Sequence, residues 1–248
     1  MRIYFFSRKS LMVTGVLSFF ILGFLCFSFC YANKSIQVSH NKEAVYQGNS
    51  GKKAVAITVN VDWGEEYIPA MLDSFAKYHA RVSFFVTGKW AEKNPELLKQ
   101  MDKEGHSIQN HGYKHLHFNN LSAADASQQI KQAEDVIHKT IGKKSKFFAS
   151  PYGEKNQNLI NVVADLNYEL IMWSVDTIDW QRPEPQVIVD RVLNKVHNDA
   201  IILMHPTEPT VKALPELLQG LDGEGYKMVT IDEILVENVE GEGNEART

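Results

Sequence analysis

The sequence predicts an α/β fold, a distorted or incomplete seven-stranded (β/α) barrel, on three observations. Short apolar runs rich in β-branched residues alternate with segments whose apolar residues recur at helical spacing, which is typical of a mostly parallel sheet covered by helices. Most polar residues that could carry chemistry follow directly after the predicted strands, where such sheets place their sites. Roughly 200 residues lie between an apolar leader and an acidic tail, enough for one domain with its own core.

The strands are expected where apolar or β-branched residues form runs too short for a helix. The first such run, AVAITVN at 54–60, is apolar enough to be a buried strand. The third is short and delivers Asn110 and His111 at its end. In chain order the strands are expected at 54–60, 81–86, 106–109, 146–149, 169–175, 200–204 and 227–231.

The helices are expected where apolar residues share one face and capping signals mark the ends. The first spans 67–78, and the second begins at Pro95. Ser122 with Asp125 forms a capping box for the third, which ends at Gly142. Three further helices are expected at 159–166, 183–196 and 211–221.

The first 32 residues are expected to be a signal peptide or a single-span membrane anchor. Basic residues precede an uncharged run at 11–32 that is long enough to cross a bilayer. Positive charge before an apolar run directs the rest of the chain outward, so we expect an exported domain that contacts the membrane only if this segment is uncleaved. The only cysteines, Cys26 and Cys30, lie in this run, so the exported part has no disulfide.

The remaining chain divides by composition. Residues 33–53 are polar and turn-rich and are expected to be a linker, residues 54–236 form the expected catalytic domain, and residues 237–248 are expected to be a disordered acidic tail. The formal net charge is −4, and no basic stripe is present in the sequence. Nucleic acid is therefore not expected as a partner.

A histidine cluster follows the third predicted strand. His106, His111, His115 and His117 fall within twelve positions, and His111 and His115 are four residues apart. Neutral imidazole is a common ligand of zinc, and catalytic zinc usually takes three protein ligands and leaves one position open. A metal site is one interpretation, and a polar loop with several surface histidines is the other.

The other candidate residues follow the remaining strands. Asn60 and Asp62 come at the end of the first strand, and Tyr152 follows the fourth. Asp179 follows the fifth strand, and His205 ends the sixth. Because the carboxyl ends of parallel strands meet at one edge of a sheet, this placement favours the metal-site interpretation of the histidine pair.

At this point the sequence resembles the polysaccharide deacetylase family, carbohydrate esterase family four. The resemblance covers 54 to about 235 and rests on five stretches in the family's order. These are TVNVDWG at 58–64, NHGYKH at 110–115, FFASPYG at 147–153, WSVDTIDW at 173–180 and LMH at 203–205. The resemblance implies an N-acetylated glycan such as peptidoglycan or a chitin-like oligomer as partner, a divalent metal, most often zinc, as cofactor, and a role in spore or vegetative wall remodelling.

The resemblance also implies roles for individual residues. His111 and His115 match the metal ligands, and Tyr152 matches the position whose neighbouring backbone amide holds the oxyanion. His205 matches the general acid that protonates the leaving amine, and Asp179 matches the carboxylate that orients it. The residues that match the apolar walls around the acetyl methyl group are Trp180 and Leu203.

Two departures from the family pattern affect the other half of the site. Where the family has a base aspartate followed by a metal aspartate, this sequence has Asn60 and Val61. Asn has no useful basicity, and Asp62, one residue later, is the expected replacement as metal ligand or water activator if strand alternation persists. The family's arginine that holds the base aspartate is replaced by Ala149, so both members of that charged pair are absent.

Two functions therefore remain open. The first is a metal-dependent deacetylase of N-acetylated polysaccharide outside the membrane, with zinc as the expected metal and an atypical, weakened site. The second is a catalytically inactive glycan-binding or envelope-assembly protein on the same fold.

Overall fold

The computed structural model describes residues 43–236, and the account below concerns that part of the chain. The expected leader at 1–32 and the expected tail at 237–248 lie outside the described residues. Within 43–236 no helix is both long and apolar enough to cross a bilayer.

The strands form one sheet of eight members in the described part of the chain, and every strand pair in it is parallel. The strands are β1 (Ala54–Val61), β2 (Ser83–Val86), β3 (Ser107–Asn110), β4 (Phe147–Phe148), β5 (Glu169–Leu170), β6 (Val175–Asp176), β7 (Ala200–Met204) and β8 (Lys227–Val229). Their order is β5-β4-β3-β2-β1-β7-β6, with β8 paired to the start of β1. The two ends of this path, β5 and β6, are not paired with each other, so the predicted incomplete barrel is confirmed.

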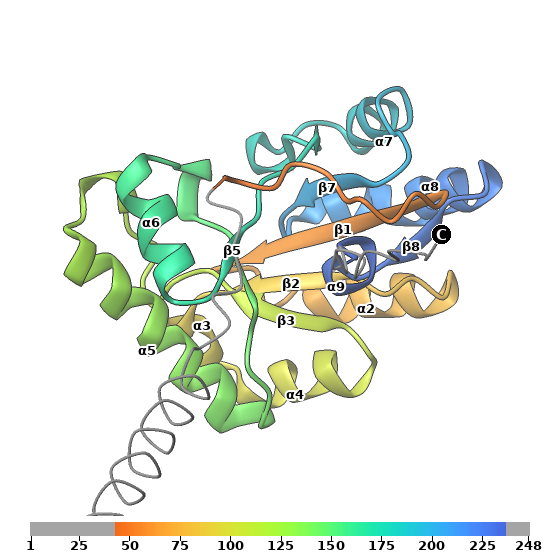
Figure 1. Cartoon of the computed structure of the whole chain (residues 1–248). Coiled ribbons are helices and arrows are strands. Elements are labelled where there is room, and N and C mark those ends of the chain that lie inside the picture. Colours follow the sequence, from red (N-terminus) through yellow and green to blue (C-terminus); the bar gives the residue numbers. More distant parts are fainter. Residues whose placement is uncertain (1–42, 237–248) are drawn as a thin grey trace, which may run out of the picture. The chain divides into compact units, whose positions relative to one another are not determined.

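Helices connect successive strands, as the alternation in the sequence predicts, except between β5 and β6 (Figure 1). They are α2 (Ile68–Lys77), α3 (Gly88–Lys93), α4 (Pro95–Lys103), α5 (Ala123–Ile141), α6 (Gln157–Asp165), α7 (Pro185–Leu193), α8 (Glu208–Gly223) and α9 (Ile231–Ile234). Three short 3₁₀ turns are η1 (Phe118–Asn120), η2 (Pro151–Gly153) and η3 (Asp179–Gln181). The predicted cap of α5 is present, because the Ser122 hydroxyl accepts the Asp125 N–H and Gly142 ends the helix with φ 72°.

Alternation along β1 separates two apolar layers. Val55, Ile57 and Val59 pack into the core between the sheet and the outer helices, and Val61 does the same. Ala56 faces the interior of the sheet, where it packs in a smaller cluster with residues of β2, β4 and β7. Asn60 lies four residues after Ala56 and therefore on the same face of the strand. Its amide points to the inner side of the sheet, whereas Val61 points into the helix layer.

The fifth predicted strand, 169–175, is wrong as a single element. It is divided into β5 and β6, which lie at the two opposite edges of the sheet. The intervening residues cross the opening of the barrel: Ile171 bridges to Val45, and the Ser174 N–H bonds to the Ile201 carbonyl at 3.1 Å. Apolar composition alone does not distinguish one long strand from two short ones separated by a crossing.

The described part of the predicted linker, residues 43–53, belongs to the folded domain. The Val45 N–H donates to the Leu170 carbonyl at 2.8 Å, and the Gly48 N–H donates to the Asp199 carbonyl at 2.8 Å. This segment therefore bonds to residues beside both β5 and β7 and covers part of the gap that the incomplete barrel leaves. Two helices, α3 and α9, were also not expected from the sequence.

Candidate functional site

A groove of about 440 Å³ lies at the carboxyl ends of the strands and contains most of the residues that the sequence singles out. Its lining consists of Asn60, Trp63, His111, His115, Tyr152, Gly153, Trp173, Asp176, Trp180, Leu203 and His205. A larger hollow of about 810 Å³ lies elsewhere, along 44–49 and 232–236, and contains none of the predicted site residues. We therefore take the smaller groove as the candidate site.

His111 is held rigidly at the end of β3. Its Nδ1 donates to the Ala149 carbonyl at 2.7 Å, which leaves Nε2 as the atom with a free lone pair. Burial, together with the neighbouring His115 and His205, lowers the pKa of His111 to about 3, so the imidazole is neutral at physiological pH. A neutral ring with one nitrogen fixed by a carbonyl is the form in which histidine binds metals.

His115 lies beside His111, with 5.1 Å between the ring centroids. Burial lowers its pKa as well, while the charge of Asp62 acts in the opposite direction. The rings of the predicted pair therefore come together as the four-residue spacing predicts, and both are neutral.

Tyr152 borders this pair and is clamped from two sides. Its ring meets His115 edge-on at 4.6 Å and stacks on His117 at 3.9 Å with an interplanar angle of 11°. The Nδ1 of His117 lies 2.7 Å from the Glu154 carboxylate, which also accepts the Asn119 N–H at 2.8 Å. Tyr152 adopts φ 60°, a left-handed conformation that is unfavourable for a tyrosine, and these contacts offset part of that cost.

Asp62 lies directly after the end of β1. β1 ends at Val61, and the Asp62 carboxylate accepts the hydroxyl proton of Thr87, the N-cap of α3, at 2.8 Å. Asp62 is not among the residues that line the groove, although its charge is felt at His115. Because β1 ends at Val61, strand alternation does not extend to Asp62, and its role as metal ligand or water activator stays a prediction.

The donor set fits a divalent metal only in part. Two neutral imidazoles are adjacent, but no group of three His, Cys, Asp or Glu side chains among residues 43–236 is arranged to hold a metal ion. Catalytic zinc usually has three protein ligands. The described residues thus provide a two-imidazole site for a divalent metal and lack the carboxylate that would complete it.

Asn60 occupies the position where the resemblance implies a base. The residue is buried, with 7% of its surface exposed, and its Oδ1 is enclosed without any hydrogen-bond partner among the described residues. Ala149, which stands where the family has an arginine, is itself buried and offers no donor. An enclosed acceptor without a partner costs on the order of 1–3 kcal/mol. The amide can neither take a proton nor carry charge at physiological pH.

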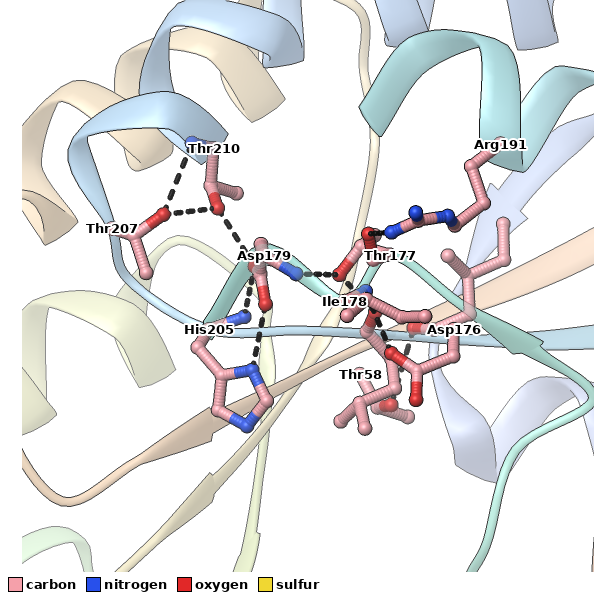
Figure 2. A network of polar contacts seen from close by, with 11 residues as sticks. Thr58, Asp176, Thr177, Ile178, Asp179, Arg191, His205, Thr207 and Thr210 are labelled. Atoms are coloured by element: carbon pink, nitrogen blue, oxygen red, sulfur yellow. Dashed lines mark hydrogen bonds and ion pairs between the residues drawn. The ribbon is translucent and has the colours of Figure 1, made fainter. Parts of the chain in front are cut away.

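The opposite wall of the site carries a complete histidine–carboxylate pair (Figure 2). The Asp179 Oδ1 lies 2.8 Å from the His205 Nδ1, and the Oδ2 accepts the His205 backbone N–H at 2.6 Å and the Thr210 hydroxyl at 2.7 Å. Asp179 is fully buried, so these three donors replace the water that its charge loses. The pair fixes the imidazole by Nδ1 and leaves Nε2 available, which is the geometry of a proton donor or acceptor.

The backbone around this pair is fixed by further bonds that Figure 2 shows. Thr177 accepts the Asp179 N–H through its hydroxyl and the Arg191 guanidinium through its carbonyl, the latter at 2.7 Å. Asp176, which lines the groove, accepts the Ile178 N–H at 2.8 Å. Asp176 therefore stabilises the loop, and Ile178 adopts φ 50° there.

Apolar walls complete the groove. Leu203 is buried on β7, two residues before His205. Trp180 is 56% exposed and forms the rim. Trp63 stacks on His205, with 6.4 Å between the ring centroids and an interplanar angle of 8°. Trp173 packs so closely on Gly153 that a Cβ there would lie 2.6 Å from the indole.

The structure thus brings together eight of the nine predicted site residues, and the ninth, Asp62, does not line the groove. The groove is lined by Asn60, His111, His115, Tyr152, Trp180, Leu203 and His205, with Asp179 directly behind His205. The sequence reasoning missed Trp63, Thr210 and the His117–Glu154 pair. The only signal for Trp63 is its position one residue after Asp62, and nothing local marks the other contacts.

A model of the polysaccharide deacetylase family matches residues 47–171, which is half of the chain. The chain belongs to this family. The "Peptidoglycan-N-acetylglucosamine deacetylase" of Bacillus cereus is 30% identical over 191 residues, which cover 75% of this chain and 70% of that protein. The resemblance found in the sequence is therefore confirmed, and family members that are known as deacetylases are metal-dependent in general.

Two other similar proteins are not named as deacetylases. The "Uncharacterized protein YlxY" of Bacillus subtilis is 41% identical over 195 residues, which cover 79% of this chain but only 61% of that protein. The solved structure of BA3943, "a CE4 family pseudoenzyme from Bacillus Anthracis", is 36% identical with a TM-score of 0.77 and covers 79% of this chain and 70% of that one. A polysaccharide deacetylase fold with 36% identity to this chain thus exists in a form named a pseudoenzyme.

Proposed function

We propose that the described domain is a weakened deacetylase of N-acetylated glycan, with peptidoglycan or a chitin-like oligomer as substrate. One observation carries this proposal: His205, held from behind by the buried Asp179, lines the same groove as His111 and His115. A groove that only bound sugar would not need a fully buried carboxylate to orient an imidazole. The peptidoglycan deacetylases among its relatives support the choice of substrate.

The residues of this groove divide the reaction between them. Leu203 and Trp180 would pack against the acetyl methyl group, and the backbone N–H beside Tyr152 would donate to the acetyl oxygen. Water attacks the acetyl carbon and gives one proton to the Nε2 of His205. The carbon–nitrogen bond then breaks as His205 passes that proton to the leaving nitrogen, which yields acetic acid and the free amine. Asp179 keeps that imidazole in the required tautomer and stabilises its protonated form.

The slow step follows from Asn60. An amide cannot remove the proton of the attacking water, and a positioned general base contributes typically 10²–10⁴-fold to rate. Turnover is therefore slow relative to relatives that have a base carboxylate.

His111 and His115 would hold the metal, and we propose zinc. A bound divalent ion would supply polarisation of the water and of the acetyl carbonyl. Because the third ligand is missing among the described residues, we expect weak binding that depends on added metal.

The second candidate is a catalytically inactive glycan-binding or envelope-assembly protein. Two observations favour it: no three-ligand group is assembled in the described chain, and the fold resembles a protein named a pseudoenzyme. Under either function, we propose that the domain acts on the outer side of the cell membrane, delivered by the segment at 1–32.

Acetate release and metal uptake distinguish the two functions. The full-length chain, incubated with zinc and either peptidoglycan fragments or chitin oligomers, should release acetate slowly. The His111→Ala and His205→Ala variants should release none, and His138→Ala, an exposed histidine on α5, should behave as wild type. Glycan binding without acetate release and without metal uptake would leave only the inactive binding protein. A chain that neither binds glycan nor releases acetate would contradict both functions.

A further inference from the structure

Arg182 lies at the rim of the groove, directly after the loop that carries the histidine–carboxylate pair. Its backbone N–H donates to the Asp179 carbonyl at 2.8 Å, and its φ of 52° is left-handed. The residue is exposed, so its position is set by the backbone and not by burial. The start of its side chain is therefore fixed relative to Asp179 and Trp180.

The guanidinium of Arg182 lies over Trp63. Its central carbon is 5.8 Å from the indole centroid, within the range of a cation–π contact. Trp63 lines the groove and stacks in turn on His205, with 6.4 Å between their centroids. The Trp63 indole thus contacts the Arg182 guanidinium and also stacks on the imidazole of His205.

The five N–H donors of this guanidinium have no acceptor among residues 43–236. Within residues 43–236, the Arg182 side chain makes no hydrogen bond and no ion pair. Glu208 is close enough for Arg182 to lower the pKa of its carboxyl, but the larger cause of that lowering is Lys212, whose ammonium lies 2.7 Å from the Glu208 carboxylate. A planar fork of donors held on an aromatic ring and not engaged by protein is suited to a carboxylate.

The charges inside the groove make this cation distinctive. No lysine or arginine lines the groove in the described chain, and its one acidic lining residue, Asp176, accepts a backbone N–H of its own loop. An acidic substituent on a bound glycan would therefore find the neutral imidazoles of His111 and His115 within the groove and the permanent positive charge of Arg182 at the Trp63 rim.

We propose that Arg182 and Trp63 form a subsite that binds a carboxylate carried by the glycan, next to the sugar whose acetamido group occupies the groove. This inference rests on the proposed function and sharpens it. A neutral chitin-like oligomer has no such group, whereas peptidoglycan carries one on the lactyl ether of muramic acid or on its stem peptide. Arg182 thereby selects acidic glycan over neutral glycan.

The test compares three glycans of matched length for binding to the full-length chain by calorimetry. They are a chitin oligomer, a glycan of alternating N-acetylglucosamine and N-acetylmuramic acid with free lactyl carboxylates, and the same glycan with stem peptides attached. We expect wild type to prefer at least one acidic glycan by about five- to tenfold at low salt, and the preference to shrink in 0.5 M salt because the subsite is exposed. Preference for the free lactyl form or for the peptide-bearing form identifies the source of the carboxylate.

The Arg182→Gln variant keeps the side-chain stem and should lose this preference while binding the chitin oligomer within about twofold of wild type. Arg182→Lys keeps the charge without the planar fork and should retain only part of it. Arg81→Gln is the matched control and should change neither affinity, because Arg81 is an exposed arginine that pairs with Glu233 and does not line the groove.

The outcomes separate this inference from the function on which it rests. Equal binding of neutral and acidic glycans by wild type, or a preference that survives Arg182→Gln, would overturn the subsite and leave the glycan groove standing. Failure of wild type to bind any of the three glycans would instead contradict the proposed function, and the subsite with it.

Discussion

Converting Asn60 to aspartate tests how the groove was altered from the family pattern. The new carboxylate would be placed where 7% of the residue is exposed and where the existing Oδ1 has no partner among the described residues. Ala149 provides no cation to balance the charge. Leaving a buried charge uncompensated costs about 3–5 kcal/mol, so Asn60→Asp should destabilise the domain by a few kcal/mol at pH 7.

The pH dependence gives this prediction its sign. Burial without a cation raises the pKa of the new carboxyl in the folded state above the ordinary value of about 3.9. The loss of stability is therefore full at pH values above the folded pKa, and it decreases as the pH falls through that value because the folded state then holds the proton. Wild type has an amide at this position, so it lacks this pH-dependent loss of stability.

Urea unfolding of a double-mutant cycle measures the effect. Ala149→Arg alone should also destabilise, because it buries an unpaired cation, and Asn60→Asp with Ala149→Arg should recover stability with a favourable interaction of about 3 kcal/mol. Asn60→Leu, which removes the unpartnered acceptor, serves as the control and should leave stability unchanged or raise it by about 1 kcal/mol. If Asn60→Asp were as stable as wild type at pH 7, our account of the missing pair would be refuted.

Three further changes test other parts of the structure. Asp179→Asn should lower the free energy of unfolding in urea by about 2–3 kcal/mol and reduce acetate release about 100-fold, because the amide cannot accept all three donors. Unchanged acetate release would show that Asp179 does not orient His205. Gly153→Ala should destabilise more than Gly51→Ala, because both have positive φ but only the first meets a neighbour, the Trp173 indole; equal melting temperatures would contradict this. Burial lowers the pKa of His106 to about 4, so as the pH falls the unfolded chain takes up this proton before the folded chain does. The free energy of unfolding should therefore fall by about 3 kcal/mol between pH 6.5 and pH 4. His106→Gln should flatten that decline, and an unchanged decline in this variant would contradict the role given to His106.

The fold was predictable because its signals are local. Buried strands such as β1 and β7 are short apolar runs, and helices such as α5 have a capped start and one apolar face. The parallel arrangement then brings strand ends together, which is why residues as distant in sequence as Asn60, His111 and His205 line one groove.

The errors arise where tertiary contacts decide. The run at 169–175 is continuous in composition, and only its pairing with opposite edges of the sheet divides it into β5 and β6. The sequence also does not reveal that β1 ends at Val61 and that the Asp62 carboxylate bonds to the Thr87 hydroxyl. Contacts such as Trp63 on His205 join residues more than a hundred positions apart, and one sequence contains no periodic signal for them.

The rate of acetate release by the paired variant Asn60→Asp with Ala149→Arg, divided by the wild-type rate under the same zinc concentration, tests the central claim most directly. If the proton-donating half of the site is complete and only the water-activating half is missing, this ratio should be about 100 or more, and Asn60→Asp alone should fall well short of it. A paired variant that folds, binds glycan and releases acetate no faster than wild type would contradict the account.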